Sequence, residues 1–299
     1  MYKYILKRLI LLIPIMLAVS FIVYFVVDLA EGDVVDIIAG TEVSQEDKEQ
    51  MREEMGLNDP VIVRYFRYMA GVVTGDMGTS PVSHLDVFDV YISKLPNTIV
   101  LAFGSIFVAL LIAIPLGITG AVHQNTWLDS GSMILGLLGI SVPTFWLGLL
   151  MIIVFSLNLG LFPSGGNEGI TSIVLPAVTL GAAQAGLIMR TTRSSMLEVL
   201  RQDYLRTARA KGVPEKEVIN KHAFKNALIP ILTVVGNQLG VSLGGAIMAE
   251  TVFAWPGVGR LVVDSISNRD TQMVTGAIIL TTMLSSVIIL LVDIAYAYV

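Results

Sequence analysis

Residues 201–230 read RQDYLRTARAKGVPEKEVINKHAFKNALIP, a charged stretch between long apolar runs. The pattern predicts two short helices joined by a hinge. Asp203 is expected to cap the first helix, whose last turn carries cations suited to the negative end of a helix dipole. Gly212 is expected to end that helix in the left-handed conformation that glycine tolerates, and Pro214 then restarts a helix at its first position.

The first of these two helices has one face of small and apolar residues. Leu205, Ala208 and Gly212 are spaced i, i+3 and i+7, and cations flank them. Such a face can sit in a groove on another protein. A solvated basic loop on the cytosolic side of a membrane is the alternative, since such loops carry an excess of Lys and Arg. These residues alone leave both interpretations open.

The composition is that of a membrane protein. Of the 299 residues, 54% are hydrophobic and 14% are charged, whereas soluble domains carry about 25% charged residues. The chain has no cysteine, which excludes disulfides and thiolate metal sites. The sequence carries no nucleic-acid-binding motif, so we expect no nucleic-acid partner.

Six uncharged runs are long enough to cross a bilayer, since about 20 residues are needed for each span. The first run exceeds the roughly 7–15 residues of a signal-peptide core, so it is expected to remain as an anchor. The fold class is therefore an all-α polytopic membrane protein with six transmembrane helices. The predicted spans are residues 9–27, 98–122, 133–157, 169–189, 226–249 and 271–292.

The distribution of Lys and Arg orients this topology. With the N-terminus in the cytosol, twelve of the nineteen basic residues lie on the cytosolic side, nine of them in 190–225. The charged stretch is therefore cytosolic, and residues 28–96 are extracytoplasmic. That outer segment carries fourteen of the 24 acids and includes a charged helix at 45–55 that Gly56 would end. It is either a solvated face or a docking surface for a substrate-delivery protein.

The fourth and fifth predicted helices have surfaces for close helix packing. The fourth holds a run of small residues at 181–186, and the fifth has Gly236, Gly240 and Gly244 at four-residue spacing. Small residues at this spacing let helix backbones approach each other in a membrane.

Three polar groups lie at membrane depth in the fifth helix, namely Asn237, Gln238 and Ser242. Such groups seldom face lipid. They either form hydrogen bonds to neighbouring helices or line a translocation pathway, and the sequence supports both interpretations.

The sequence shows no constellation of catalytic residues, so no catalytic or metal-binding residue is assigned. The three histidines are scattered, and the chain lacks the phosphate loop G-x-x-x-x-G-K-[ST]. Energy for transport must then come from another subunit or from an ion gradient. An ion-driven transporter usually has ionisable groups near mid-membrane and paired repeats, neither of which this sequence shows clearly. That class and a membrane scaffold remain as alternatives.

RTARAKG at 206–212, followed by VPEKEVINKHAFKNALIP, resembles the coupling-loop signature of ABC-transporter permease subunits that import peptides and nickel. Ala208 and Gly212 match the wider superfamily pattern, in which Glu-Ala-Ala and three further residues precede Gly. Arg206 and Thr207 replace the Glu and the first Ala, which is usual in the peptide and nickel branch. The resemblance extends over essentially the whole chain through similar segments at 29–33, 52–80, 95–103, 142–150 and 249–270.

This resemblance implies a type I ABC importer permease fold. Residues 1–95 would form an anchor helix and an extracytoplasmic segment, and residues 96–299 would form the transmembrane domain. Coupling helices at about 203–221 would transmit the motion of ATPase subunits to the permease. The expected ATPase-coupling residues are Leu205, Arg206, Thr207, Ala208, Arg209 and Gly212.

The resemblance also implies the partners and the compartment. The chain would bind no cofactor itself, because ATP and Mg would bind two partner ATPase subunits. A second homologous permease, an extracytoplasmic substrate-binding protein and the lipid bilayer complete the expected partners. The location would be the plasma (inner) membrane of a bacterium or archaeon. Peptides are the expected substrates, with nickel chelates, glutathione or sugars as alternatives.

Overall fold

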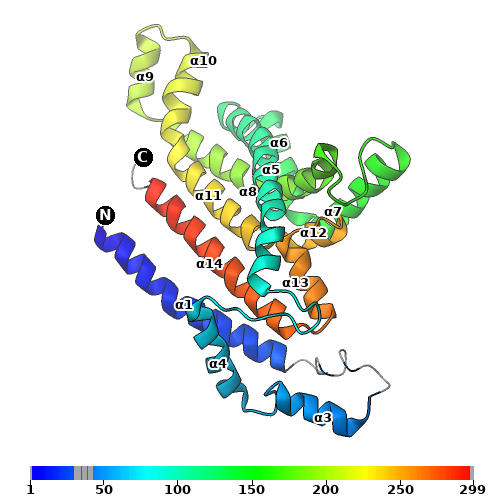
Figure 1. Cartoon of the computed structure of the whole chain (residues 1–299). Helices are drawn as coiled ribbons and strands as arrows, with labels where there is room; N and C mark the ends of the chain where they lie inside the picture. Colours follow the sequence, from blue (N-terminus) through cyan, green and yellow to red (C-terminus); the bar gives the residue numbers. More distant parts are fainter. Residues whose placement is uncertain (1, 30–34, 36–38, 40–42, 297–299) are drawn as a thin grey trace. The chain divides into compact units, whose positions relative to one another are not determined.

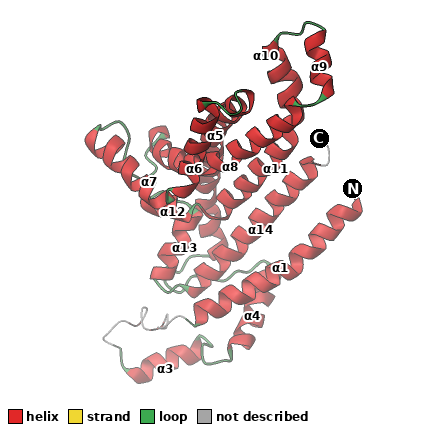
Figure 2. Cartoon of the chain, turned by 180° about the vertical axis from the view of Figure 1, so that it is seen from behind, coloured by secondary structure: helices red, strands yellow, loops and turns green. Residues whose placement is uncertain are grey.

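The computed structural model describes residues 2–29, 35, 39 and 43–296, and these residues are largely helical. The one β pairing within these ranges is an isolated bridge between Thr79 and Asp86. The expected all-α class is confirmed (Figures 1 and 2). The chain divides into two compact units. The N-terminal unit comprises Met1–Thr98 and Pro256–Ser286, and the main unit comprises Ile99–Trp255 and Val287–Val299.

The N-terminal unit holds one long helix and several short ones. They are α1 (Tyr2–Asp28), α3 (Gln45–Glu54), α4 (Val61–Thr74) and α13 (Val258–Ser267). The expected charged helix is α3, and Gly56 follows it with a φ of +65°. Tyr65 of α4 packs on α1, with its hydroxyl 2.9 Å from Ser20 Oγ. Arg64 Nη2 lies 2.7 Å from Asp28 Oδ1. These contacts hold α4 against the last turns of α1.

The start of α5 (Val87–Val122), up to Thr98, and the larger part of α14 (Thr271–Tyr296), up to Ser286, also belong to the N-terminal unit. Ser80, in the loop before α5, donates a hydrogen bond to the carboxylate of Asp270 just before α14. α5 begins well before the span predicted at 98–122 and runs without interruption through residue 95. The division of the chain at residue 95 stays a prediction.

The main unit is arranged around α8 (Val174–Leu200), which contacts α6 (Trp127–Ser141) and α11 (Phe224–Gly245). Small residues permit this packing. A Cβ added at Gly181 of α8 would lie 2.7 Å from the carbonyl oxygen of Ser105 on α5. Real Cβ atoms do not approach backbone so closely, so this contact requires glycine. The small-residue packing surface expected on the fourth helix is confirmed.

The glycines of the fifth helix meet the last turns of α14. A Cβ on Gly236 would overlap the side chain of Val292, and one on Gly240 would lie 3.0 Å from Ile289 Cγ1. Gly244 is exposed. The close seam expected along α11 therefore includes the first two of its three glycines.

The third predicted span is not one straight helix. α6 ends at Ser141, α7 (Thr144–Met151) begins after Pro143, and the two are bent by 99°. Proline disfavours a helical conformation for the residue before it, and Val142 is extended with a ψ of 123°. The expectation of a single helix at 133–157 is corrected to a bent pair.

Within the described ranges, four helices are long and apolar enough to cross a membrane, and the bent pair would make a fifth. α1 contributes a shorter apolar stretch, Ile13–Asp28. A multi-pass membrane protein is therefore supported, while the number of six spans stays a prediction. The four long spans are Val87–Val122, Ile170–Leu200, Glu215–Gly244 and Thr271–Val292.

Candidate functional site

The charged stretch folds as a pair of helices beyond the ends of α8 and α11 (Figure 1). α9 (Asp203–Ala210) follows α8 after a two-residue turn. α10 (Glu215–Glu217) leads through a π-helical segment, Val218–Ala223, directly into α11. Gly212 lies between α9 and α10 with a φ of +78°, as expected. α10 is therefore continuous with the long helix α11.

Two details of the expected capping are wrong. Gln202 is the N-cap of α9, and Asp203 lies in the first helical turn, where its charge still suits the positive end of the helix dipole. Pro214 is the N-cap of α10 rather than its first helical residue. Glu215 and Glu217 occupy the first turn of α10, where their charges suit the positive end of the helix dipole.

Leu205 anchors α9 to the main unit. Its side chain is completely buried, and Ala208 packs at the edge of the same cluster. The prediction that these two residues fit a groove on a partner is therefore corrected, because they face the core of their own chain. The cluster around Leu205 includes Met196, Val218, Ala223, Ala227 and Ile231.

The outward side of α9 is polar. Arg206, Thr207 and Arg209 are exposed, as is Gly212 beyond the helix. Sequence reasoning missed Tyr204, which is 43% exposed. Its signal was its spacing, since Tyr204 lies three residues before Thr207 on the same side of the helix. Four of the six predicted coupling residues are therefore accessible to a partner, namely Arg206, Thr207, Arg209 and Gly212. The other two, Leu205 and Ala208, hold the helix on its own chain.

An ion pair closes the hinge between α9 and α10. Arg209 Nε and Nη2 donate to the two carboxylate oxygens of Glu215 at 2.9 and 2.7 Å. Hydrogen bonding to Glu215 raises the pKa of the Arg209 guanidinium, so Arg209 stays charged at physiological pH. The side chains are 38% and 55% exposed, so we expect this pair to contribute at most about 1 kcal/mol to stability. Its bidentate geometry fixes the orientation of the two helices.

The polar residues of the fifth helix have different surroundings. Ser242 is buried and accepts a hydrogen bond from Gln184 Nε2 of α8 at 2.6 Å. Gln184 Nε2 also lies 3.4 Å from Ser105 Oγ of α5. Asn237 is exposed and Gln238 is half-buried. Ser242 is therefore part of a polar tie between three helices, whereas Asn237 and Gln238 lie nearer the surface of the main unit.

Sequence reasoning missed two polar groups of α8. Gln184 forms the tie just described, and its only signal was an amide within a run of small residues. Arg193 Nε and Nη2 donate to Asp129 Oδ1 and Oδ2 of α6 at 2.5 and 2.7 Å. The Asp129 side chain is 7% exposed. The sequence gives no sign of this pairing, because the two residues lie 64 positions apart.

Two family descriptions match the chain. "Binding-protein-dependent transport system inner membrane component" matches residues 113–299, and the description of its N-terminal part matches residues 1–102. The chain belongs to this family. It is thus a permease subunit of a binding-protein-dependent ABC transporter, and the interpretations as an ion-driven transporter or a scaffold are set aside.

Curated relatives match this permease along its whole length. The glutathione transport system permease protein GsiC of Salmonella paratyphi A (strain ATCC 9150 / SARB42) is 43% identical over 297 residues, which cover 99% of this chain and 97% of the relative. The oligopeptide transport system permease protein AppB of Bacillus subtilis (strain 168) is 38% identical over 310 residues, covering 100% and 98%. The resemblance seen in the sequence is confirmed.

A solved structure shares the fold. A chain of the inward-facing MetNI methionine ABC transporter aligns with a TM-score of 0.61 and 21% identity, over 71% of this chain and 96% of its own length. The match supports the expected type I importer permease fold.

Proposed function

We propose that this permease conducts short peptides across the plasma membrane of a bacterium into the cytosol. The observation that carries the proposal is the match over at least 99% of the chain to permeases named for oligopeptide and glutathione transport. Glutathione is itself a tripeptide, so both names describe small peptide-like solutes. Glutathione is a specific second candidate, because its permease is 43% identical and the oligopeptide permease 38%.

We infer that the chain works with four kinds of partner. Two ATPase subunits bind ATP and Mg, a second homologous permease completes the membrane pathway, a binding protein delivers the substrate, and the bilayer surrounds the permeases. The excess of Lys and Arg in 190–225 supports a cytosolic N-terminus and, with it, a position of α9 on the ATPase side.

In this proposal α9 and α10 couple ATP hydrolysis to transport. The exposed side of α9, with Tyr204, Arg206, Thr207 and Arg209, contacts an ATPase. Leu205 holds α9 on the main unit, so a push on α9 moves the core of the unit instead of bending a loose loop. The continuous helical path from Glu215 to Gly245 carries that movement along α11.

The same proposal assigns different roles to the polar residues of α11. We infer that Asn237 and Gln238 line the translocation pathway, since neither is buried within the main unit. Ser242 was also predicted to line the pathway. We infer that it supports the pathway indirectly, because its hydrogen bond with Gln184 holds α8 against α11. Replacing Asn237 should change substrate preference, and replacing Ser242 should change activity without changing preference.

The test is reconstitution of the purified complex in proteoliposomes with its binding protein. ATP hydrolysis and uptake are measured with a set of di- to pentapeptides and with glutathione. We expect stimulation by at least one peptide class, together with ATP-dependent uptake. A complex stimulated only by a nickel chelate or a sugar, with no response to any peptide, would contradict the peptide assignment but leave the transporter class intact.

A further inference from the structure

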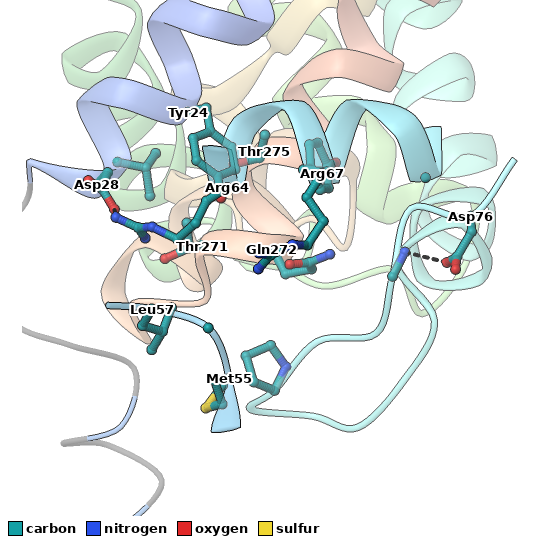
Figure 3. A pocket seen from close by; sticks show the side chains of 16 residues that line it. Tyr24, Asp28, Met55, Leu57, Arg64, Arg67, Asp76, Thr271, Gln272 and Thr275 are labelled. Carbon is teal, nitrogen blue, oxygen red and sulfur yellow. Dashed lines mark hydrogen bonds and ion pairs between the residues drawn. The ribbon is translucent and has the colours of Figure 1, made fainter. Parts of the chain in front are cut away.

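The N-terminal unit contains a cavity lined by both polar and apolar groups. Its volume is about 510 Å³, within the range of about 300–1,000 Å³ usual for small-molecule sites. The walls come from the end of α1, the start of α14, α4 and the loop after it (Figure 3). The charged and hydroxyl groups of the lining are Tyr24, Asp28, Arg64, Arg67, Tyr68, Asp76, Thr271 and Thr275.

Two of these hydroxyls are buried without a partner. Within the described residues, Tyr68 Oη and Thr275 Oγ1 have no hydrogen-bond partner. Thr275 is only 1% exposed. Burial raises the pKa of Tyr68, so its hydroxyl keeps its proton and can donate a hydrogen bond. Buried polar groups in native proteins are normally paired. These two hydroxyls are therefore placed to bind a polar ligand in the cavity.

The charges of the lining are balanced. Arg64 pairs with Asp28 at 2.7 Å, and Arg67 is 60% exposed and pairs with Asp59 at the rim. Asp76 lies on the opposite side of the cavity from Asp28 in Figure 3, with the arginines between them. Two guanidinium groups and two carboxylates match a ligand that carries both a negative and a positive group.

The predicted topology puts the cavity at the membrane surface. Asp28 is the last residue of α1, and Thr271 is the first of the span in α14. Beside the cavity, α4 exposes Phe66 and Ile62, which are 65% and 51% exposed. An amphipathic helix with an exposed apolar face typically lies in the plane of the headgroups. Tyr24 and Tyr68 fit this depth, since tyrosines are enriched at membrane interfaces.

We propose that this cavity binds the headgroup of a zwitterionic phospholipid whose amine is primary, as in phosphatidylethanolamine. The phosphodiester lies on Arg67 and the Tyr68 hydroxyl, and the ammonium group lies at the carboxylate of Asp76, on the side of the cavity away from the Arg64–Asp28 pair. The acyl chains run along the exposed apolar residues of α4 and the end of α1. With the proposed orientation of the chain, the lipid comes from the outer leaflet.

Native mass spectrometry of the purified transporter complex tests this site. The complex is titrated with phosphatidylethanolamine, phosphatidylcholine and phosphatidylglycerol of identical acyl chains. We expect the ethanolamine lipid to be retained several-fold better than the other two, because a quaternary amine cannot donate hydrogen bonds and an anionic headgroup lacks the ammonium group. Arg67→Gln and Tyr68→Phe should each reduce that retention several-fold.

The matched control is Arg260→Gln on α13, an arginine outside the cavity that pairs with Asp264 of its own helix. It should leave lipid retention unchanged. Equal retention of the three lipids, or retention unaffected by Arg67→Gln and Tyr68→Phe, would overturn the proposal. Equal displacement by soluble glycerophosphoethanolamine or by a free dipeptide would show a site for soluble zwitterions and would also overturn it.

The proposed lipid site does not depend on which substrate the permease carries. Peptide-stimulated ATP hydrolysis is therefore measured on the same preparations. Normal stimulation together with absent lipid selectivity would reject the lipid site alone. Lipid selectivity without any peptide response would support the lipid site while contradicting the peptide assignment.

Discussion

The helices α9 and α4 are both short and amphipathic, yet they present opposite faces outward. α9 buries Leu205 completely and exposes its charges. α4 exposes Phe66, while Arg64 points into a cavity and pairs with Asp28. A helix at an aqueous surface buries its apolar face in protein, whereas a helix on a bilayer can leave that face to lipid. From this contrast we expect α9 to face water or a protein partner and α4 to lie at the membrane surface.

The largest expected effect comes from reversing the polarity of α9. Leu205→Asp would place a carboxylate within a cluster of apolar side chains. The cost should exceed the ~2–5 kcal/mol typical of Leu→Ala in a core, because the charge loses its water as well. We expect loss of transport and rapid proteolysis between α9 and α10 in membrane vesicles.

Leu205→Met is the matched control for this change. Methionine has a similar volume and keeps the site apolar, so transport and protease resistance should stay close to those of the unmodified protein. Full transport by the Leu205→Asp protein would mean that α9 does not need its anchor. The argument that α9 must bury its apolar face in protein, unlike α4, would then be contradicted.

The next effect concerns the hinge. Gly212 has a φ of +78°, and an added Cβ there would meet no atom within 4 Å. Gly212→Val is therefore penalised by backbone conformation alone, at roughly 1–2 kcal/mol or more for a β-branched residue. We expect normal membrane insertion, continued ATP hydrolysis and uptake reduced about tenfold.

Asparagine tolerates the left-handed conformation better than valine. Gly212→Asn should therefore recover most of the uptake lost in Gly212→Val. If the two variants lose uptake equally, the space around residue 212 in the assembled transporter matters more than its backbone conformation. A partner contact at this exposed position would then be the explanation.

Local features of this fold could be predicted from the sequence, and contacts between distant residues could not. The charge and spacing around Gly212 predicted both α9 and its left-handed stop, because a helix end depends on a few neighbouring residues. The burial of Leu205 was missed, since its cluster includes Val218 and Ile231 from later segments. The Asp129–Arg193 pair was missed for the same reason.

The third span shows where a local signal was present but underused. Pro143 was visible in the sequence, and proline restricts the residue before it. The uncharged run around Pro143 was nevertheless long enough for one helix. A hydropathy profile does not show whether the helix axis changes direction within such a run. The 99° bend between α6 and α7 follows from the backbone, not from the apolar composition.

Labelling of single cysteines tests directly whether α9 faces water and α4 faces the membrane. These substitutions should affect transport less than the changes at Leu205 and Gly212. The chain has no cysteine of its own, so Thr207→Cys and Phe66→Cys each provide one thiol. A membrane-impermeant maleimide should label Thr207→Cys in inside-out vesicles and not in intact cells. Phe66→Cys should react slowly from either side, and an environment-sensitive fluorophore there should report an apolar surrounding.

These labels also test the topology. Labelling of Thr207→Cys from outside intact cells would reverse the proposed orientation. Fast labelling of Phe66→Cys in both membrane preparations would place α4 in water. The contrast between the two helices would then be unexplained, and the lipid site would lose its membrane context.

The smallest expected effect concerns the Arg209–Glu215 pair. Its geometry is bidentate, at 2.9 and 2.7 Å, but both side chains are more than a third exposed. Screening should limit the stability change of Arg209→Gln to about 1 kcal/mol or less. We therefore expect a nearly unchanged melting temperature and a modest loss of ATPase association that grows smaller at high salt. Arg206→Gln, which removes a more exposed charge of α9 without opening the hinge, should weaken association with the same salt dependence. If only Arg209→Gln reduces uptake per ATP hydrolysed, the pair matters for hinge geometry and not merely for surface charge.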